Sequence, residues 1–394
     1  MNAIHLLPLE EEASAERQKR ALFLINGEHY AGAERVQDLL ALHLPSFGWR
    51  VDFVCLKPRA FADAREARGS NVIDLPMRSH FDLAPVREVA HLLRQGGYDV
   101  LHTHTVRSLL IGYFASGRSG KPMVHHVHSR TDRDTENARR NAFNSMVQRF
   151  GLRRARRLIA VSGSTGEYLR ELGYEDSRIS VIPNGVPSAK VARDWHAPRS
   201  TWTIGMAALF RPRKGVEVLI EALAALHAQG RPVRLRAVGG FENEAYRQQV
   251  LAFAEAKGVS ALIDWTGFTR DVTGELARMD LFVVPSLYGE GLPMVMLEAM
   301  AAGLPVVASS NEGMPEVLDY GATGVLVPPG DVVALTRALD RLIESPDHAR
   351  VLSQAGLQRQ RERYSETAMA RQVAAVYREL CQQSSHQENR RKAG

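Results

Sequence analysis

The stretch from Leu281 to Ser309 constrains the fold more than any other part of the chain. It reads LFVVPSLYGEGLPMVMLEAMAAGLPVVAS, an apolar strand, a loop with two glycines and a proline, a helix, and a second apolar strand. Apolar strands joined by a helix are typical of a βαβ unit in a parallel sheet that is buried on both faces. The loop after the first strand of such a unit lies at the carboxyl edge of the sheet, where open α/β sheets bind ligands. We therefore expect an α/β fold with a ligand site at residues 286–293.

Two carboxylates frame this loop, Glu290 within it and Glu298 on the helix that follows. A helix N-terminus, here starting at Pro293, offers free N–H groups and partial positive charge to a phosphate. Glu298 lies between Leu297 and Ala299 on an otherwise apolar helix, where an unpaired charge would be costly. The pair could accept hydrogen bonds from the hydroxyls of a ribose and a sugar ring. The alternative is a buried helix whose two Glu cap backbone groups or pair with Arg.

The arrangement E-G-x-P-x-x-x-x-E, followed by A-M-A-A-G-x-P-V-V-A, resembles the donor-site signature of the retaining glycosyltransferase family 4. The resemblance covers about residues 21–380. It implies an α/β fold of the GT-B type, in which two Rossmann-like domains face each other across a cleft. It also implies that a C-terminal helix crosses back to the N-terminal domain.

The resemblance assigns the donor site to the second domain. Lys214 matches the family's K-G motif and implies a contact with the donor diphosphate, whereas the family's usual Arg falls on Ala208 or Leu209, so that Arg211 or Arg213 is left to replace it. Glu290 would bind the sugar hydroxyls and, with Lys214 and His128, form the catalytic set. The remaining donor-binding residues that the resemblance implies are Glu298 on the ribose, Gly291, Leu292 and Pro293 at the diphosphate, Arg211, and Gly239, Gly267 and Phe268 at the nucleotide.

The resemblance assigns the acceptor site to the first domain. Gly32 to Arg35 resembles the family's GGAER loop, although Ala31 replaces its first glycine, and a plain turn between strand and helix is the alternative. His128 matches the strand-end histidine of the family, which implies a place near the transferred sugar. His104 and Asn184 are further matches, which the resemblance places on the acceptor side and at the end of this domain; polar strand caps are the alternative for both histidines.

Two groups of residues raise the question of a metal. The sequences HTHT and HHVH hold five histidines, but they alternate along strands, and no H-x-x-x-H helix accompanies them. The aspartates of Asp132-Arg133-Asp134 suit a helix N-terminus without any ion. We therefore expect no metal ligands and no cofactor.

Other function classes lack their signals. A dinucleotide dehydrogenase needs G-x-G-x-x-G after its first strand and an acid at the end of the second, whereas this chain has G-x-x-x-x-G and Lys57. No RNA-binding aromatic motif or zinc-finger spacing occurs, so we expect no nucleic-acid partner.

The length of 394 residues exceeds what one core usually covers and predicts two domains. Two cysteines, no secretion signal and no apolar run of membrane-spanning length favour a cytoplasmic location. The expected organisation is a disordered tail at 1–19, an N-terminal domain at 20–186, a linker at 187–200, a C-terminal domain at 201–364, a crossing helix at 365–381 and a disordered tail at 382–394.

The net charge is +6, and five arginines crowd the stretch QRFGLRRARRL: Arg149, Arg153, Arg154, Arg156 and Arg157. A solvated helix end is the plain interpretation. The sharper hypothesis is a peripheral contact with an anionic membrane on the inner face of the cell.

The expected function is therefore metal-independent, retaining transfer of a sugar from a nucleoside-diphosphate sugar to a hydroxyl of a glycan or a polyprenyl-diphosphate-linked acceptor, in the synthesis of cell-surface polysaccharide. Two alternatives stay open, because a fold does not fix a function. One is a nucleotide-sugar epimerase or a phosphorylase of the same fold, and the other is a non-catalytic protein that binds a nucleotide sugar. The sequence favours no particular sugar or base.

Overall fold

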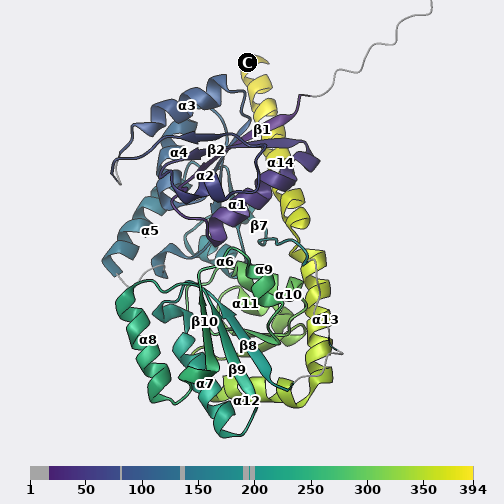
Figure 1. Cartoon of the computed structure of the whole chain (residues 1–394). Helices are drawn as coiled ribbons and strands as arrows, with labels where there is room; N and C mark the ends of the chain where they lie inside the picture. The colour runs from purple at the N-terminus through teal and green to yellow at the C-terminus, as the bar shows by residue number, and fades with distance from the viewer. Residues whose placement is uncertain (1–16, 80–81, 134–137, 190–194, 196–199, 394) are drawn as a thin grey trace, which may run out of the picture.

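The computed structural model describes residues 17–79, 82–133, 138–189, 195 and 200–393, and every structural statement below concerns these residues. They form two α/β domains, which lie one above the other in Figure 1. Two C-terminal helices run along one side of both domains. The expectation of a two-domain Rossmann-like fold is therefore confirmed.

The first domain is built on a parallel sheet of seven strands in the order β3-β2-β1-β4-β5-β6-β7. The central strand, β1, is apolar on both faces, as a strand covered by helices on both sides must be. Its Phe23 pairs in register with Phe53 and with His102 of the neighbouring strands. The strands are β1 Lys19–Ile25, β2 Trp49–Cys55, β3 Val72–Asp74, β4 Val100–Thr103, β5 Met123–Val127, β6 Arg157–Ala160 and β7 Ile179–Val181.

The second domain repeats this plan with six parallel strands in the order β10-β9-β8-β11-β12-β13. Both orders are those of a doubly wound sheet, which reverses between β1 and β4 and between β8 and β11. The predicted strand at Leu281 is β11, and it ends at Val284. The strands are β8 Trp202–Ala207, β9 Val233–Val238, β10 Ile263–Gly267, β11 Leu281–Val284, β12 Val306–Ser309 and β13 Val325–Val327.

Helices cover both faces of each sheet (Figure 1). The predicted helix after Pro293 is α10, with Pro293 itself at the N-cap and Gly303, at φ 70°, just beyond the C-cap. The helices of the first domain are α1 Gly32–His43, α2 Ala60–Ala64, α3 Pro85–Gln95, α4 Val106–Ser119, α5 Ala138–Leu152 and α6 Gly163–Glu171. Those of the second domain are α7 Val216–Ala228, α8 Glu244–Ala256, α9 Val272–Leu276, α10 Met294–Ala301, α11 Met314–Val317, α12 Val332–Glu344 and α13 Pro346–Arg363.

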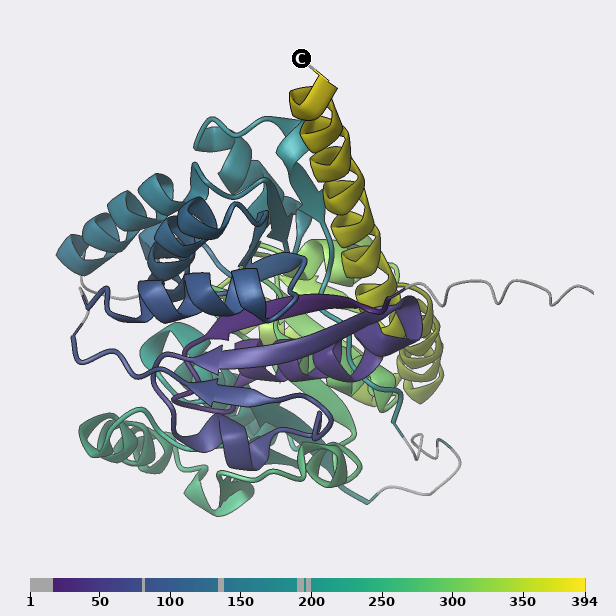
Figure 2. The ribbon, with the colours of Figure 1, turned by 90° about the horizontal axis from the view of Figure 1, so that it is seen from above.

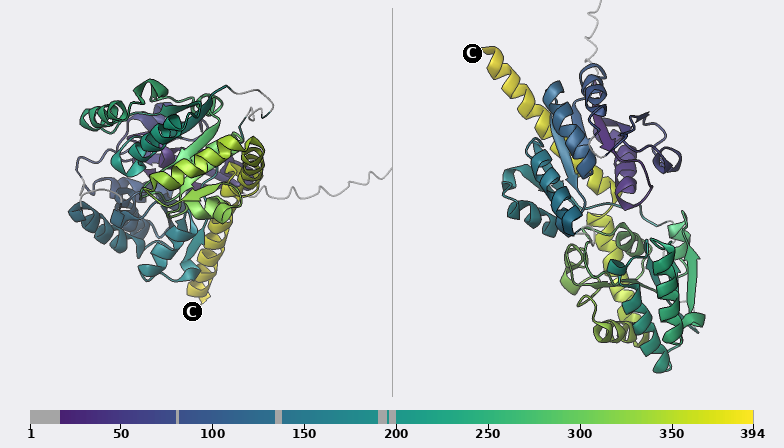
Figure 3. Two further views of the ribbon diagram at one scale, coloured as in Figure 1. Left: turned by 90° about the horizontal axis from the view of Figure 1, so that it is seen from below. Right: turned by 90° about the vertical axis from the view of Figure 1, so that its left-hand side faces the viewer.

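The last helix, α14 Glu366–Ala393, crosses back onto the first domain, as the family resemblance implies. Figures 2 and 3 show it lying against the purple and blue segments of that domain. Its Tyr377 is fully buried and packs edge-on against Trp49, with the ring centroids 4.9 Å apart. The chain crosses between the domains twice, at Val186 and at Ser365, and these two residues form a β-bridge.

The structure bears differently on the two predictions of a disordered tail. Residues 382–393 continue α14, so the prediction of a disordered C-terminal tail is wrong for them. The segment is rich in Gln, Glu, Arg and Lys and holds no Pro or Gly before residue 394, and such residues favour a helix. At the other end β1 already includes Lys19, while residues 1–16 and most of the expected linker, residues 190–194 and 196–199, lie outside the described residues.

Candidate active site

The expected donor residues gather at the point where the strand order of the second sheet reverses. Lys214 follows β8, at the end of a short 3-10 turn, η4 Pro212–Lys214, and Glu290 lies in the loop after β11. Strands β8 and β11 are neighbours in the sheet, so the two loops meet at its carboxyl edge. Gly215 allows this meeting: its φ is 68°, and a Cβ there would lie 2.2 Å from the carbonyl oxygen of Pro285.

Glu290 is the centre of a buried, charged group. Its carboxylate accepts hydrogen bonds from the Lys214 ammonium and from the Ser286 hydroxyl, the latter at 2.9 Å, and only 6% of the residue is exposed. Burial acts to raise the pKa of Glu290, but the charges of Lys214 and Arg213 outweigh it and hold that pKa below its usual range. Glu290 is therefore a carboxylate at neutral pH, and its oxygens can accept hydrogen bonds from hydroxyl groups.

The second cation of this group is Arg213 rather than Arg211. The Arg213 guanidinium lies 4.0 Å from the Glu290 carboxylate and donates to the carbonyl oxygen of Gly289 at 2.5 Å. Arg211 precedes the 3-10 turn and lies 3.7 Å from Glu242 instead. Of the two replacements that the sequence left open, the geometry therefore favours Arg213.

Glu298, on α10, lies at the junction of the two domains. Its carboxylate forms an ion pair with Arg35 of α1, and its side chain is 11% exposed. The ion pair with Arg35 offsets the free-energy cost of burying a carboxylate on an apolar helix. Sequence reasoning did not assign Arg35 to the site, although it is the last residue of the loop that resembles GGAER.

The loop around Gly291 touches the first domain closely. A Cβ on Gly291 would lie 1.9 Å from the carbonyl oxygen of His128, so only glycine fits there. The Asn184 amide donates to the carbonyl oxygen of Leu292 at 3.1 Å. Gly32 faces α10, because a Cβ built on it would lie 3.7 Å from Met294. These contacts place Gly32, Asn184, His128, Gly291 and Leu292 together at the junction.

Glu312 belongs to this site and escaped the sequence analysis. Its carboxylate accepts a hydrogen bond from the Gly289 N–H at 2.8 Å, and burial raises its pKa. It has a φ of 46°, a left-handed conformation that is uncommon for a residue with a Cβ. A signal was present in the sequence: residues 312–317, EGMPEV, resemble the family motif G-G-x-P-E-V with Glu312 in place of the first glycine, but the resemblance assigned Glu312 no role.

The expected nucleotide residues lie at the ends of β9 and β10. The Gly239 N–H donates to the carbonyl oxygen of Gly267 at 2.9 Å, and both glycines have positive φ. Phe268 follows directly and is 76% exposed. An exposed aromatic ring at a strand end can stack on a base.

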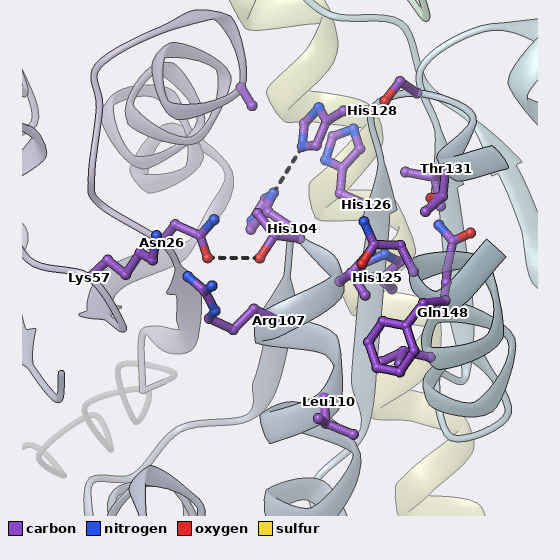
Figure 4. Close-up of a pocket in the computed structure, with 18 of the residues that line it drawn as sticks. Asn26, Lys57, His104, Arg107, Leu110, His125, His126, His128, Thr131 and Gln148 are labelled. Atoms are coloured by element: carbon purple, nitrogen blue, oxygen red, sulfur yellow. Dashed lines mark hydrogen bonds between the residues drawn. The ribbon is translucent and has the colours of Figure 1, made fainter. Parts of the chain in front are cut away.

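A cavity of about 530 Å³ lies beside the strand ends of the first domain. Figure 4 shows residues of its lining that come from the ends of β1, β2, β4 and β5, with the rings of His104, His126 and His128 close together. The His104 Nδ1 and His128 Nε2 atoms are 3.3 Å apart. Burial lowers the pKa of His128 to about 4, so this ring is neutral at pH 7.

The D-x-D sequence gives no sign of a metal site in the described residues. Asp132 pairs with Arg130 at 3.1 Å, and Asp134 lies outside the described residues. None of the described helices combines the length and the apolar character needed to cross a membrane.

Comparison with known proteins agrees with this geometry. The family model "Glycosyltransferase Family 4" matches residues 30–190, and "Glycosyl transferases group 1" matches residues 190–359. The chain is 30% identical over 318 residues to an MMP alpha-(1->4)-mannosyltransferase of Mycolicibacterium hassiacum, covering 77% of this chain and 75% of the relative. It is 31% identical over 310 residues to a phosphatidyl-myo-inositol mannosyltransferase of Mycobacterium leprae, covering 76% of this chain and 78% of the relative.

Among solved structures, the Anabaena protein Alr3699/HepE in complex with UDP and glucose is similar in fold. Its TM-score is 0.80 at 22% identity, over 91% of this chain and 99% of that one. The two family models together match residues 30–359, and Lys214, Glu290 and His128 all lie within this range. The chain therefore belongs to the family 4 glycosyltransferases of the GT-B fold and is an enzyme of the glycosyltransferase type.

Proposed function

We propose that this glycosyltransferase moves a sugar, with retention of configuration, from a nucleoside-diphosphate sugar to a hydroxyl of a glycan or lipid-linked acceptor. The observation that carries the proposal is the buried group of Glu290, Lys214 and Arg213 where the second sheet reverses its strand order. Two cations beside a helix N-terminus suit a leaving diphosphate, and the carboxylate suits the hydroxyls of the sugar.

In the transfer step, the bond between the anomeric carbon and the diphosphate oxygen breaks. The acceptor oxygen bonds to that carbon on the same face, and its proton passes to the leaving phosphate. Lys214 and Arg213 stabilise the charge that develops on the diphosphate, a role that metal ions fill in other transferases. The proposal therefore needs no metal at the diphosphate, so adding Mg²⁺ or Mn²⁺ should not raise the transfer rate.

The acceptor would occupy the cavity of the first domain. Lys57, Arg107 and Arg140 line it together with one acid, Glu28, so its lining carries an excess of positive charge. This charge favours an acceptor with a phosphate or diphosphate, such as a polyprenyl-diphosphate-linked glycan in the synthesis of cell-surface polysaccharide. The name of the M. leprae relative, which includes phosphatidyl-myo-inositol, is consistent with a lipid-linked acceptor.

A thermal-shift screen over UDP-, GDP- and ADP-sugars tests the donor. We expect one nucleotide class to raise the melting temperature and Glu298→Ala to weaken that binding about tenfold to a hundredfold, because two hydrogen bonds to a charged group are lost. The matched control is Glu255→Ala, an exposed acid on α8, which should bind like the parent protein. Full affinity in the Glu298 variant would contradict the ribose assignment. If the protein binds a nucleotide sugar but transfers the sugar to no acceptor, the result favours a non-catalytic protein. If it consumes the nucleotide sugar without any acceptor, the result favours an epimerase.

The membrane hypothesis has a defined surface in the structure. Arg149, Arg153, Arg154 and Arg156 are exposed at and after the end of α5, whereas Arg157 belongs to β6 and pairs with Glu379. The same helix exposes three large apolar residues at helical spacing, Phe143, Met146 and Phe150. Apolar side chains among arginines suit the surface of an anionic bilayer.

Vesicle flotation tests this surface. We expect the protein to bind vesicles with anionic lipid more strongly than neutral ones, because each Arg near the membrane adds about 1 kcal/mol. Changing the four exposed arginines to Gln should remove most of that preference. Changing four exposed arginines of the second domain should not; these are Arg337, Arg341, Arg361 and Arg363. Equal binding to both kinds of vesicle would refute the membrane contact.

A further inference from the structure

Four histidine rings stack in the first domain, where β4 and β5 end side by side. The ring centroids of His102 and His104 are 4.2 Å apart, and those of His126 and His128 are 4.5 Å apart. His102 and His126 join the two pairs at 5.5 Å with nearly parallel planes. The spacing of two residues within each strand places all four rings on one face of the sheet.

Two of these rings have one nitrogen engaged and the other without a partner. His102 Nδ1 is 2.5 Å from the Tyr377 hydroxyl of α14, and His104 Nδ1 is 3.3 Å from His128 Nε2. The Nε2 atoms of His102 and His104 have no hydrogen-bond partner among the described residues, and neither ring nitrogen of His126 has one.

These unpartnered nitrogens are deeply buried. His102 and His126 are 0% exposed and His104 is 4% exposed. A buried polar atom without a partner loses its hydrogen bonds to water and gains none in return, so several in one place require an explanation.

We propose that His102, His104 and His126 bind a divalent transition-metal ion of the zinc class. One ring nitrogen from each residue lies within 4.8 Å of the others. A tetrahedral zinc ion with bonds of about 2.0–2.1 Å needs nitrogens roughly 3.4 Å apart. On binding, the three rings would therefore move closer and turn out of their stack, so that their in-plane lone pairs meet at one point. Neutral imidazole is the commonest protein ligand for such an ion.

The neighbours of the three rings suit this role. A ligating histidine usually makes a hydrogen bond through its other ring nitrogen, which fixes the tautomer, and Tyr377 and His128 supply such partners to His102 and His104. His104 and His126 also line the cavity, so the fourth coordination position would face its interior and take a water molecule or a group of the acceptor.

The proposed ion joins three segments that are distant in the sequence. It would link the ends of β4 and β5 and, through Tyr377, the crossing helix α14. It is separate from the Lys214–Glu290 group of the second domain, so the inference does not rest on the proposed sugar transfer. The sequence predicted no zinc site because it lacks a metal-binding helix motif. In the structure the three proposed ligands come from the adjacent strands β4 and β5 and the residues that follow them.

Metal analysis of the full-length chain, purified without a histidine tag, tests the proposal. We expect about one zinc or similar ion per chain, or, after dialysis against a chelator, a rise of several degrees in melting temperature on adding Zn²⁺. Co²⁺ should give the visible absorption of a tetrahedral site. His126→Gln should abolish these signals, and the matched control His348→Ala, on the exposed side of α13, should keep them.

A second variant covers the case in which His126→Gln does not fold. Tyr377→Phe keeps the ring and removes only the hydroxyl that contacts His102, and we expect it to weaken Zn²⁺ binding about tenfold to a hundredfold. The proposal is overturned if the purified chain holds no metal and Zn²⁺ leaves its melting temperature unchanged. It is equally overturned if binding is lost in the His348 variant and retained in the other two.

Discussion

Lys214→Ala and Glu290→Ala are each expected to lower the transfer rate by at least about a hundredfold, with the fold retained. In the proposed transfer Lys214 stabilises the charge of the leaving diphosphate, and loss of one such group typically costs about 10²–10³ in kcat. Loss of Glu290 would remove the acceptor of hydrogen bonds from the sugar and leave two cations unpaired. The measurement is kcat with a fixed donor and acceptor, together with circular dichroism of each variant.

Three further variants make this test specific. Arg213→Ala should lower the rate markedly and Arg211→Ala only slightly, because Arg213 lies beside Glu290 and Arg211 beside Glu242. Lys257→Ala, an exposed cation paired with Glu221 on the surface, should be neutral. Retained turnover in both the Lys214 and Glu290 variants would refute the site.

Tyr377→Ala is expected to destabilise the protein by about 3–5 kcal/mol, the usual cost of removing a large buried aromatic side chain. Tyr377 is 0% exposed and packs against Trp49 of the first domain. Urea unfolding followed by tryptophan fluorescence measures the loss. Arg378→Ala, the next residue and an exposed one, is the control and should change stability by less than about 0.5 kcal/mol.

The same experiment tests the role of the crossing helix. If α14 were only an appendage, Tyr377→Ala would unfold like the control. The expected loss would instead make the C-terminal helix part of the first domain's core, which also includes Val373 and Ala374.

The sequence predicted the fold well because its signals are local. Apolar strands at regular intervals predict parallel sheets, and the spacing of Glu290 and Glu298 follows from one loop and one helix. The prediction that residues 382–393 are disordered was wrong because it rested on their polar composition alone. The segment holds no Pro or Gly, and its residues favour a helix.

Contacts between distant segments could not be predicted in the same way. The Arg35–Glu298 pair joins the two domains, and no local pattern indicates which cation meets a given carboxylate. The histidines of β4 and β5 illustrate the same limit, because alternation predicts which face a ring lies on but not which strands are neighbours. Choosing Arg213 over Arg211 required the 3-10 turn that begins at Pro212.

The double crossing of the chain has a consequence for the order of events. Val186 and Ser365 are bridged, and the Val186 N–H donates to the carbonyl oxygen of Tyr364 at 2.9 Å, so the two connections are tied together at one point. A rotation of the domains about this point would leave Lys214 and Glu290 together, since both belong to the second domain, but would separate Gly291 from His128 and Arg35 from Glu298. An open enzyme would therefore hold its donor just as a closed one does, and only closure would bring the acceptor side within reach.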